Sequence, residues 1–368
     1  MKFTIDKRIL TEAVSNLQRA VSTKTSIPAL EGILIRTDVE KIILSAYDLE
    51  IGMQTELPAV ISAPGAIILT AKLFSEIVRK SPAEDVTVES DDRNTATITS
   101  GVSCFTIIGM NAAEFPEFPK ITDTDTLRLP ANVLKSMIRQ TLFAIADSNA
   151  KPIHQGSLFK IEDNMLDVVS VDGYRLALRR EAIRFDGSLD FVVPGKTLSE
   201  VLKLLRDDDG EVEICPSRRH ILFKIDNYTV LSALLEGEFL DYRAALPKDK
   251  KTEVTVSTRT LIDSVERVSL LITDRLKSPV RCVFNEDTVK LLCSTTMGRA
   301  NDQIEAKITG DPLEIGFNNK YLLDALRAAE CDEVRLELGG PISPMLVLPK
   351  EGDSFSFLVL PVRLRSEV

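Results

Sequence analysis

Hydrophobic residues near the start of the chain recur at helical spacing. Leu10, Val14, Leu17 and Val21 are separated by steps of four, three and four residues. This spacing places the four side chains on one face of a helix. The residues between them are mostly polar, so the pattern predicts an amphipathic helix with one buried side.

The helical pattern belongs to a repeat that divides the chain into thirds. Lys72, Lys196 and Lys320 lie 124 residues apart, and each opens a second amphipathic stretch in its third. A period this long is typical of a repeated domain, since solenoid units are about 20–50 residues long. The predicted helices cover residues 6–21, 71–80, 131–146, 195–206, 257–272 and 319–329.

Strand-like runs lie between the predicted helices of each third. Examples are residues 33–35, 42–44 and 168–171, which are rich in Ile, Leu and Val. Short strands joined by tight turns favour antiparallel sheets with helices on one face. The pattern of each third therefore predicts two β-α-β-β-β units. The predicted fold class is α+β, with three tandem repeats of this domain. The predicted domains are residues 1–122, 127–247 and 252–368.

The charge of the chain is unevenly distributed. The whole chain has a formal net charge of −10, but the predicted helices hold fifteen basic and seven acidic residues, a balance of +8. Solvated helix faces alone account for such a bias in one interpretation. In the other, the helices share a surface that faces a polyanion. Lys and Arg without interspersed aromatic residues favour contacts with phosphates over stacking on bases.

Cysteine usage and hydropathy predict a cytoplasmic protein. The five cysteines are scattered without a CxxC pair, which is typical of reduced thiols. Residues 1–6 predict a strand and not a secretory leader, and no apolar run approaches the roughly 20 residues of a membrane span.

Catalytic motifs are weak in this sequence. Gly195-Lys196-Thr197 resembles the end of a phosphate-binding loop, but Asp190 stands where that loop needs a further glycine. The chain has two histidines, and its Asp207-Asp208-Asp209 run lacks the spacing of a calcium loop. We expect no catalytic residue, no cofactor and no metal, although an enzyme such as a hydrolase remains a third alternative.

One turn differs between the repeats. Asp172-Gly173 is a tight-turn signal between two strand-like runs, and its counterpart at residues 45–50 lacks the Asp-Gly pair. This difference predicts a site that exists on the second repeat only.

Several stretches, in order along the whole chain, resemble the bacterial sliding clamps, the beta (processivity) subunits of DNA polymerase III. The matching stretches are Met1-Lys2-Phe3, Ser45 to Glu50, Glu114-Phe115-Pro116, Asp172 to Ala177, Pro194-Gly195-Lys196, Leu235 to Phe239, and Leu360 to Leu364. Each stretch is short, and it is their order over three tandem repeats that makes the resemblance specific.

The resemblance implies a DNA clamp fold in a head-to-tail homodimeric ring. Helices would line the inside, antiparallel sheets would form the outside, and double-stranded DNA would pass through without sequence-specific contacts. The implied DNA-binding residues are Lys24, Lys72, Ser148, Lys151 and Lys196. The implied dimer interface joins Phe105 and Ile107 of one subunit to Leu271 and Ile272 of the other.

The resemblance also implies a hydrophobic groove that binds linear motifs of the DNA polymerase III alpha subunit, the clamp loader, other polymerases and repair proteins. The implied groove residues are His154, Val171, Gly173, Tyr174, Arg175, Leu176, Leu240, Ala245, Tyr321, Val359, Leu360, Pro361, Val362 and Arg363.

This chain departs from the family pattern at a few groove positions. His154 stands where Leu is usual, Leu240 replaces the usual Pro, and Ala244 takes a position that is often basic. The expected function is a non-enzymatic clamp that tethers the replicative polymerase. The alternative is a peptide-binding scaffold that does not encircle DNA.

Overall fold

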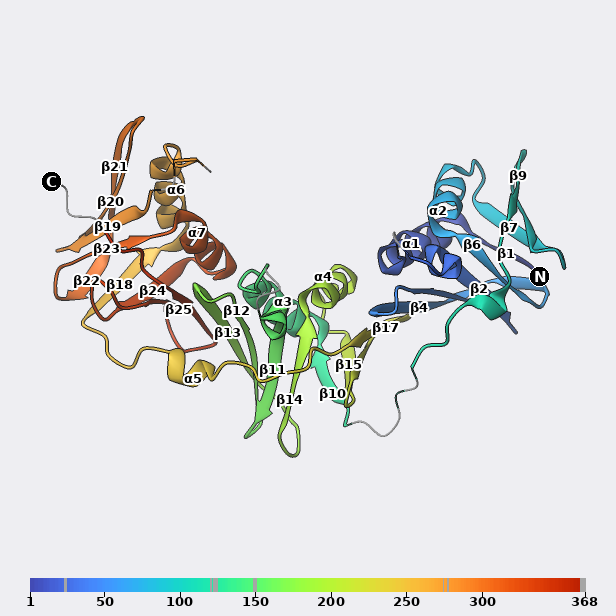
Figure 1. The fold of residues 1–368 in the computed structure, drawn as a ribbon, viewed down its shortest axis with the longest axis horizontal. Coiled ribbons are helices and arrows are strands. Elements are labelled where there is room, and N and C mark those ends of the chain that lie inside the picture. Colours follow the sequence, from blue (N-terminus) through green and yellow to red (C-terminus); the bar gives the residue numbers. More distant parts are fainter. Residues whose placement is uncertain are drawn as a thin grey trace. The chain divides into compact units, whose positions relative to one another are not determined.

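The computed structural model describes residues 1–22, 25–119, 121, 125–147, 151–273, 275–276 and 278–364. In these residues, 26 strands and seven α-helices follow one another (Figure 1). All the strand pairs between them are antiparallel, so the predicted α+β class is confirmed.

The first repeat contains nine strands and two helices. They are β1 (Lys2–Asp6), α1 (Lys7–Leu17), β2 (Gly32–Asp38), β3 (Lys41–Tyr47), β4 (Ile51–Pro58), β5 (Val60–Ala63), β6 (Ala66–Thr70), α2 (Ala71–Lys80), β7 (Asp85–Ser90), β8 (Thr95–Ser100) and β9 (Ser103–Ile108).

The second repeat follows the same order without an additional strand. Its elements are β10 (Leu127–Pro130), α3 (Ala131–Leu142), β11 (Gly156–Glu162), β12 (Met165–Val171), β13 (Arg175–Ala182), β14 (Leu189–Pro194), α4 (Gly195–Leu204), β15 (Glu211–Pro216), β16 (His220–Ile225) and β17 (Tyr228–Ala233).

The third repeat is preceded by the short helix α5 (Tyr242–Ala245). Its elements are β18 (Thr252–Ser257), α6 (Thr258–Ser269), β19 (Val280–Asn285), β20 (Thr288–Thr295), β21 (Gly298–Glu305), β22 (Lys307–Gly310), β23 (Leu313–Phe317), α7 (Asn319–Ala328), β24 (Glu333–Leu338), β25 (Met345–Pro349) and β26 (Phe355–Val359). Each repeat thus contains the two predicted β-α-β-β-β units, with β5 and β22 as additions.

The chain forms two compact units, each of which includes part of the middle repeat. The first unit comprises Met1–Asn132 and Lys203–Leu234, and the second comprises Val133–Leu202 and Leu235–Val368. The first unit holds a five-stranded sheet, β5-β1-β7-β8-β9, and an eight-stranded sheet, β10-β15-β16-β17-β4-β3-β2-β6. The second holds a nine-stranded sheet, β14-β11-β12-β13-β26-β25-β24-β18-β22, and a four-stranded sheet, β21-β20-β19-β23.

Two strand pairs join one sequence repeat to the next. In the first unit, β17 of the second repeat pairs with β4 of the first, with Tyr228 opposite Thr55. In the second unit, β26 of the third repeat pairs with β13 of the second, with Arg175 opposite Val359. Each large sheet is therefore built from two repeats, because backbone hydrogen bonds continue across the boundary.

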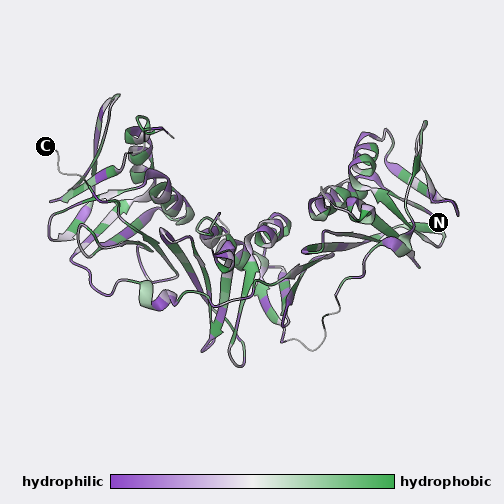
Figure 2. Ribbon diagram, in the orientation of Figure 1, coloured by the Kyte–Doolittle hydropathy of each residue, from purple (hydrophilic) through white to green (hydrophobic). Residues whose placement is uncertain are grey.

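The helices of each unit cover the buried sides of the strands. In the first unit, α1 and α2 lie side by side and α1 packs on β3 and β4; in the second, α6 and α7 lie side by side and α6 packs on β19, β20 and β21 (Figure 1). The predicted apolar face of α1 is confirmed for Leu10, Val14 and Leu17, which are fully buried, whereas Val21 is extended and follows the 3₁₀ turn Gln18–Ala20, so the helix is shorter than the predicted range 6–21. Figure 2 shows hydrophobic and hydrophilic residues interleaved along these elements, as one-sided burial requires.

The turn predicted to distinguish the second repeat has a close counterpart in the first. The Asp172 side chain accepts hydrogen bonds from the N–H groups of residues 174 and 175, and Gly173 has a φ of +90°. Asp48 accepts the same two bonds from residues 50 and 51, and Leu49 has a φ of +75°. The backbone turn is therefore shared by the two repeats, so its geometry does not distinguish the second repeat, and the predicted site on the second repeat stays a prediction.

Candidate functional site

An apolar cluster lies in the second unit where β12, β13, β25 and β26 meet the segment that carries α5. Its buried members are Ile153, Leu158, Val169, Val171, Leu176, Leu178, Val192, Tyr242, Leu346, Leu348 and Leu358. These side chains come from six strands, from the 3₁₀ turn Pro152–Gln155 and from α5. The cluster therefore forms a buried floor against the central strands of the nine-stranded sheet.

Large apolar side chains that belong to the predicted groove remain exposed beside this floor. Tyr174 is 60% exposed, Leu240 41%, Leu360 37% and Val362 38%. We call these four residues the apolar rim. Four apolar side chains from three separate segments of the chain form a surface that a partner could cover.

Backbone hydrogen bonds fix two members of the apolar rim. The N–H of Leu360 donates to the carbonyl of Tyr174 at 2.9 Å, which continues the β13–β26 pairing past the last strand residue. Two residues further on, the N–H of Val362 donates to the carbonyl of Gly316 at 2.8 Å. The C-terminal segment is thus anchored at alternate residues, with Pro361 between the two anchors.

Two tyrosines and an arginine form an aromatic shelf next to the apolar rim. The rings of Tyr174 and Tyr321 stack with centroids 5.7 Å apart and 22° between their planes. The guanidinium carbon of Arg175 lies 4.6 Å from the centroid of the Tyr321 ring. Arg175 itself is only 7% exposed, so it supports the shelf from below.

His154 lies at the edge of the buried cluster. Its ring meets the ring of Phe239 edge to face, with centroids 5.4 Å apart. Burial, together with the nearby charge of Lys151, lowers the pKa of His154 below its usual value. The imidazole is therefore neutral at pH 7. At a position where Leu is usual in the family, it adds polar atoms but no charge.

A buried carboxylate holds the segment that carries α5 against the sheet. Asp167 on β12 is 2% exposed and accepts two hydrogen bonds from Arg180, at 2.7 and 2.9 Å. It also accepts a hydrogen bond from the hydroxyl of Tyr242 at 2.7 Å. The interaction positions Leu240 and Ala245, which lie on either side of Tyr242 and are both exposed.

All fourteen predicted groove residues lie within the second unit. Val171, Leu176 and Val359 are buried at the ends of paired strands, and Tyr174, Arg175 and Tyr321 contact one another. Gly173 forms the β12–β13 turn, and Arg363 is exposed after Val362. Sequence reasoning missed Asp167, Asp324 and Phe143, because their partners are distant in sequence and no local motif marks them.

The described members of the predicted DNA-binding set are exposed. Lys72 and Lys196 are each the second residue of a helix, α2 and α4, and Lys320 holds the same place on α7. Lys151 is exposed just before the 3₁₀ turn. Lys24 and Ser148 lie outside the described residues.

Many helix cations are paired with carboxylates. Arg259 contacts Asp263 at 3.0 Å and Arg267 contacts Asp302 at 2.5 Å, so both arginines of α6 are neutralised locally. The balance of +8 therefore overstates the positive charge that the helices present to a partner.

The predicted dimer residues lie on an exposed strand edge and after a helix. Phe105, which is 41% exposed, and Ile107 lie on β9, which is the last strand of the five-stranded sheet and pairs only with β8 among the described strands. Leu271 and Ile272 follow α6 in the second unit and are partly buried against its core. The two pairs belong to different units.

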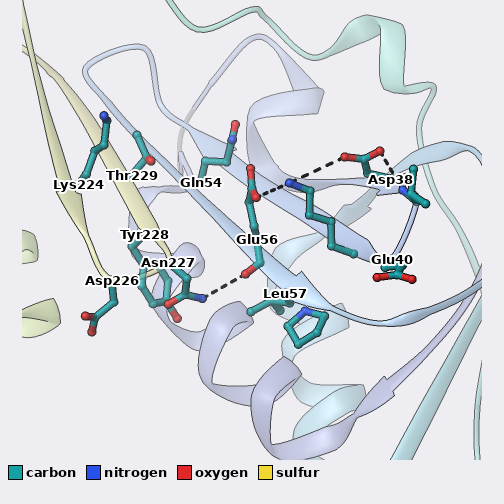
Figure 3. Close-up of a pocket in the computed structure, with 13 residues that line it drawn as sticks. Asp38, Glu40, Gln54, Glu56, Leu57, Lys224, Asp226, Asn227, Tyr228 and Thr229 are labelled. Carbon is teal, nitrogen blue, oxygen red and sulfur yellow. Dashed lines mark hydrogen bonds and ion pairs between the residues drawn. The ribbon is translucent and has the colours of Figure 1, made fainter.

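The first unit contains a polar pocket at the junction of β4 and β17 (Figure 3). Lys41 contacts Glu56 at 2.6 Å and Asp38 at 3.8 Å, while the side-chain amide of Asn227 donates to the carbonyl of Glu56. These interactions join the β2–β3 and β16–β17 turns to β4. The polar groups of the pocket thus mainly bind one another.

The described part of the chain contains neither a candidate metal cluster nor a candidate membrane span. No group of three or more His, Cys, Asp and Glu side chains there is arranged to hold a metal ion. No helix among the described residues is long and apolar enough to cross a membrane.

Family models match nearly the whole chain. The N-terminal, central and C-terminal domains of the DNA polymerase III beta subunit match residues 1–119, 128–241 and 243–363, respectively. A curated relative, the beta sliding clamp of Bacillus subtilis (strain 168), is 34% identical over 376 residues, which cover 99% of this chain and 100% of the relative.

Solved structures agree with these matches. The DNA polymerase sliding clamp of Bacillus subtilis has a TM-score of 0.96 at 34% identity and covers 99% of this chain and 100% of its own. A structure described as a putative DNA polymerase III beta subunit from Eubacterium rectale has a TM-score of 0.93 at 37% identity, with 98% and 99% coverage. A sliding clamp from Pseudomonas aeruginosa bound to griselimycin has a TM-score of 0.94 at 26% identity, with 99% and 100% coverage.

The fold and these matches define the class as a DNA sliding clamp, a processivity factor without catalytic activity of its own. The chain belongs to the DNA polymerase III beta subunit family. Membership favours the clamp over the peptide-binding scaffold that the sequence left open.

Proposed function

We propose that this clamp works in the cytoplasm as a head-to-tail homodimeric ring that encircles duplex DNA and tethers the replicative polymerase to it. The exposed edge of β9 supports the proposed subunit contact, because an unpaired strand edge with apolar side chains is a template for pairing with another chain. A head-to-tail contact closes into a ring when its rotation permits it.

The positions of the repeated lysines support contacts with DNA phosphates. Lys72 lies in the first turn of α2, and the side chain of Thr70 makes no capping hydrogen bond there. The positive end of the helix dipole therefore adds to the charge of the lysine. Such contacts bind phosphates without reading bases, so the protein can slide along the duplex.

We further propose that the apolar rim and the aromatic shelf dock linear motifs of the polymerase III alpha subunit, the clamp loader, other polymerases and repair proteins. Exposed apolar side chains beside a buried floor, with a few polar groups between them, have the chemistry of a peptide-binding surface. The neutral His154 at the edge of the floor favours an apolar or uncharged peptide side chain nearby.

The ring proposal is tested by topology. The protein, loaded with a clamp loader and ATP on nicked circular DNA, is expected to stay bound during gel filtration. It is expected to leave when the circle is cut at one site, because only the closed path retains a ring. Equal retention on circular and linear DNA would contradict encirclement.

The docking proposal is tested by changing the rim. The double variant Leu360→Ala, Pro361→Ala is expected to lose most of its affinity for a labelled linear motif of the polymerase III alpha subunit. The two changes truncate the apolar side chains of the segment that the backbone hydrogen bonds anchor. Ile342→Ala is the matched control, since Ile342 is 77% exposed in the second unit and lies outside the rim. Unchanged peptide affinity in the double variant would contradict the proposal.

A further inference from the structure

Arg175 is held by two carboxylates from different parts of the second unit. Its Nε donates to Asp172 at 2.9 Å, and its Nη1 donates to Asp324 on α7 at 2.5 Å. Asp172 is 12% exposed and Asp324 23% at the side chain, so solvent screens both ion pairs weakly. The protein itself therefore holds the guanidinium in place through two of its five N–H groups.

The same guanidinium lies between two aromatic rings. Its carbon is 4.6 Å from the centroid of Tyr321 and 5.4 Å from the centroid of Phe143. Tyr321 in turn stacks on Tyr174, which belongs to the apolar rim. A planar cation that is fixed at both ends therefore sets where the Tyr321 ring rests, and through it the Tyr174 ring.

The positions 124 residues earlier in the chain lack this arrangement, although they share the turn. Subtracting the repeat length of 124 from Arg175 and Tyr321 gives Ile51 and Thr197, which offer neither a guanidinium nor an aromatic ring. The acidic positions are retained, since Asp48 corresponds to Asp172 and Glu200 to Asp324. An arginine and a tyrosine thus accompany two acidic positions that recur with the repeat length of 124 residues.

We propose that Asp172 and Asp324 are positioning residues for peptide docking, which act by holding Arg175 under the Tyr174–Tyr321 shelf. The inference rests on the proposed docking function and goes beyond it, because Asp324 lies on α7 and belongs to neither the rim nor the shelf. Its carboxylate acts on a partner peptide through Arg175 and Tyr321.

The test measures the affinity of a fluorescein-labelled linear motif of the polymerase III alpha subunit by anisotropy. Asp324→Asn is expected to weaken binding roughly tenfold, because one neutralised partner releases the guanidinium and the ring above it. Asp324→Glu is expected to restore most of the affinity. Glu266→Gln is the matched control, since Glu266 on α6 pairs at 2.7 Å with Arg327, which is on the same helix as Asp324, and Glu266 belongs to neither the rim nor the shelf.

A double-mutant cycle separates positioning from a general structural role. Tyr321→Ala is expected to weaken binding, and adding Asp324→Asn to it is expected to cost little more, because Asp324 acts through that ring. If the fold-losses of affinity of the two single variants multiply in the double variant, the two residues act independently and the proposal is overturned. Wild-type affinity in Asp324→Asn would also overturn it.

Two further measurements keep the outcome clear. Asp172→Asn retains an oxygen that accepts the turn N–H groups, and it is expected to weaken binding in the same way if Asp324→Asn fails to fold. Wild-type affinity in Asp172→Asn would overturn the proposal. If the unmodified protein does not bind the peptide, the docking function itself fails, which is a separate result.

Discussion

At the scale of single residues, Asp167 shows how one buried carboxylate can secure a segment of chain. Burial alone would raise the pKa of Asp167, but the hydrogen bonds from Arg180 and Tyr242 outweigh burial and lower it below its usual value of 3.8. The charged form is therefore the one that the fold stabilises, and it ties α5 to β12 and β13.

We predict that Asp167→Ala lowers the free energy of unfolding of the second unit by about 3 kcal/mol, because it leaves the Arg180 guanidinium partly buried without its main partner. Urea denaturation at neutral pH measures the change. Glu314→Ala is the control, since its side chain is 45% exposed and its pair with Arg281 is worth less than about 1 kcal/mol. Equal effects of the two changes would contradict the prediction.

Asp167 also predicts how the stability of the second unit depends on pH. The pKa of Asp167 is lower in the folded state than its usual value of 3.8, so its stabilising contribution is complete above that value. The contribution is lost as the pH falls through the folded-state pKa. We therefore expect the stability advantage of the wild type over Asp167→Asn to be constant near neutral pH and to shrink below about pH 4. Urea midpoints across this range measure it, and a constant difference would be the contrary result.

At the scale of elements, the helices were the most predictable part of the molecule. The ranges 71–80 and 319–329 predict α2 and α7 to within a residue, because several turns of apolar spacing define a buried face. The helix α5 was missed, since Tyr242–Ala245 is one turn long and has no periodicity. The pairing of β4 with β17 was also beyond the sequence, because Thr55 and Tyr228 are far apart in the chain and no local signal names the partner strand.

The edge strand β9 supports a prediction about assembly. The double variant Phe105→Lys, Ile107→Lys is expected to dissociate the proposed dimer, because two charges on an unpaired edge oppose pairing with another chain. Sedimentation should then show a species of 40.7 kDa, whereas the wild type is expected at twice that mass if the proposed dimer forms. Val60→Lys is the control, since Val60 is 70% exposed on β5, the other edge of the same sheet. A dimer that persists in the double variant would exclude β9 from the contact.

At the scale of the whole molecule, the sequence predicted the charge bias but not how far ion pairs reduce it. Lys72 and Lys320 make no ion pair with a carboxylate among the described residues, whereas the arginines of α6 do. The composition of the peptide surface came from the family resemblance, because its residues lie on segments that only the folded sheet brings together. The contact between Arg175 and Asp324, 149 residues apart, had no sequence signal.

The exposed lysines predict that the affinity for linear duplex DNA depends on salt concentration, independently of encirclement. Lys72→Ala is expected to reduce the slope of log affinity for linear duplex against log salt by about 0.9, the value for one lost phosphate contact. Retention on closed circles should not change, because topology and not charge would hold the proposed ring on the DNA. Lys290→Ala is the control, since Lys290 is exposed on β20 between the buried Val289 and Leu291. A reduced slope for Lys290→Ala, or an unchanged slope for Lys72→Ala, would contradict the assignment of Lys72 to a phosphate contact.

The pairing of β17 with β4 also has a consequence for synthesis on the ribosome. A nascent chain that has emerged only to residue 122 holds every strand of the first repeat. At that point β4 can pair with β3 on one side but still lacks β17 on the other. That neighbour, Tyr228–Ala233, is made about a hundred residues later, which at bacterial elongation rates is a delay of several seconds. Throughout that interval the open edge of β4 is available to the wrong strand, so the first repeat depends on the prompt arrival of the second.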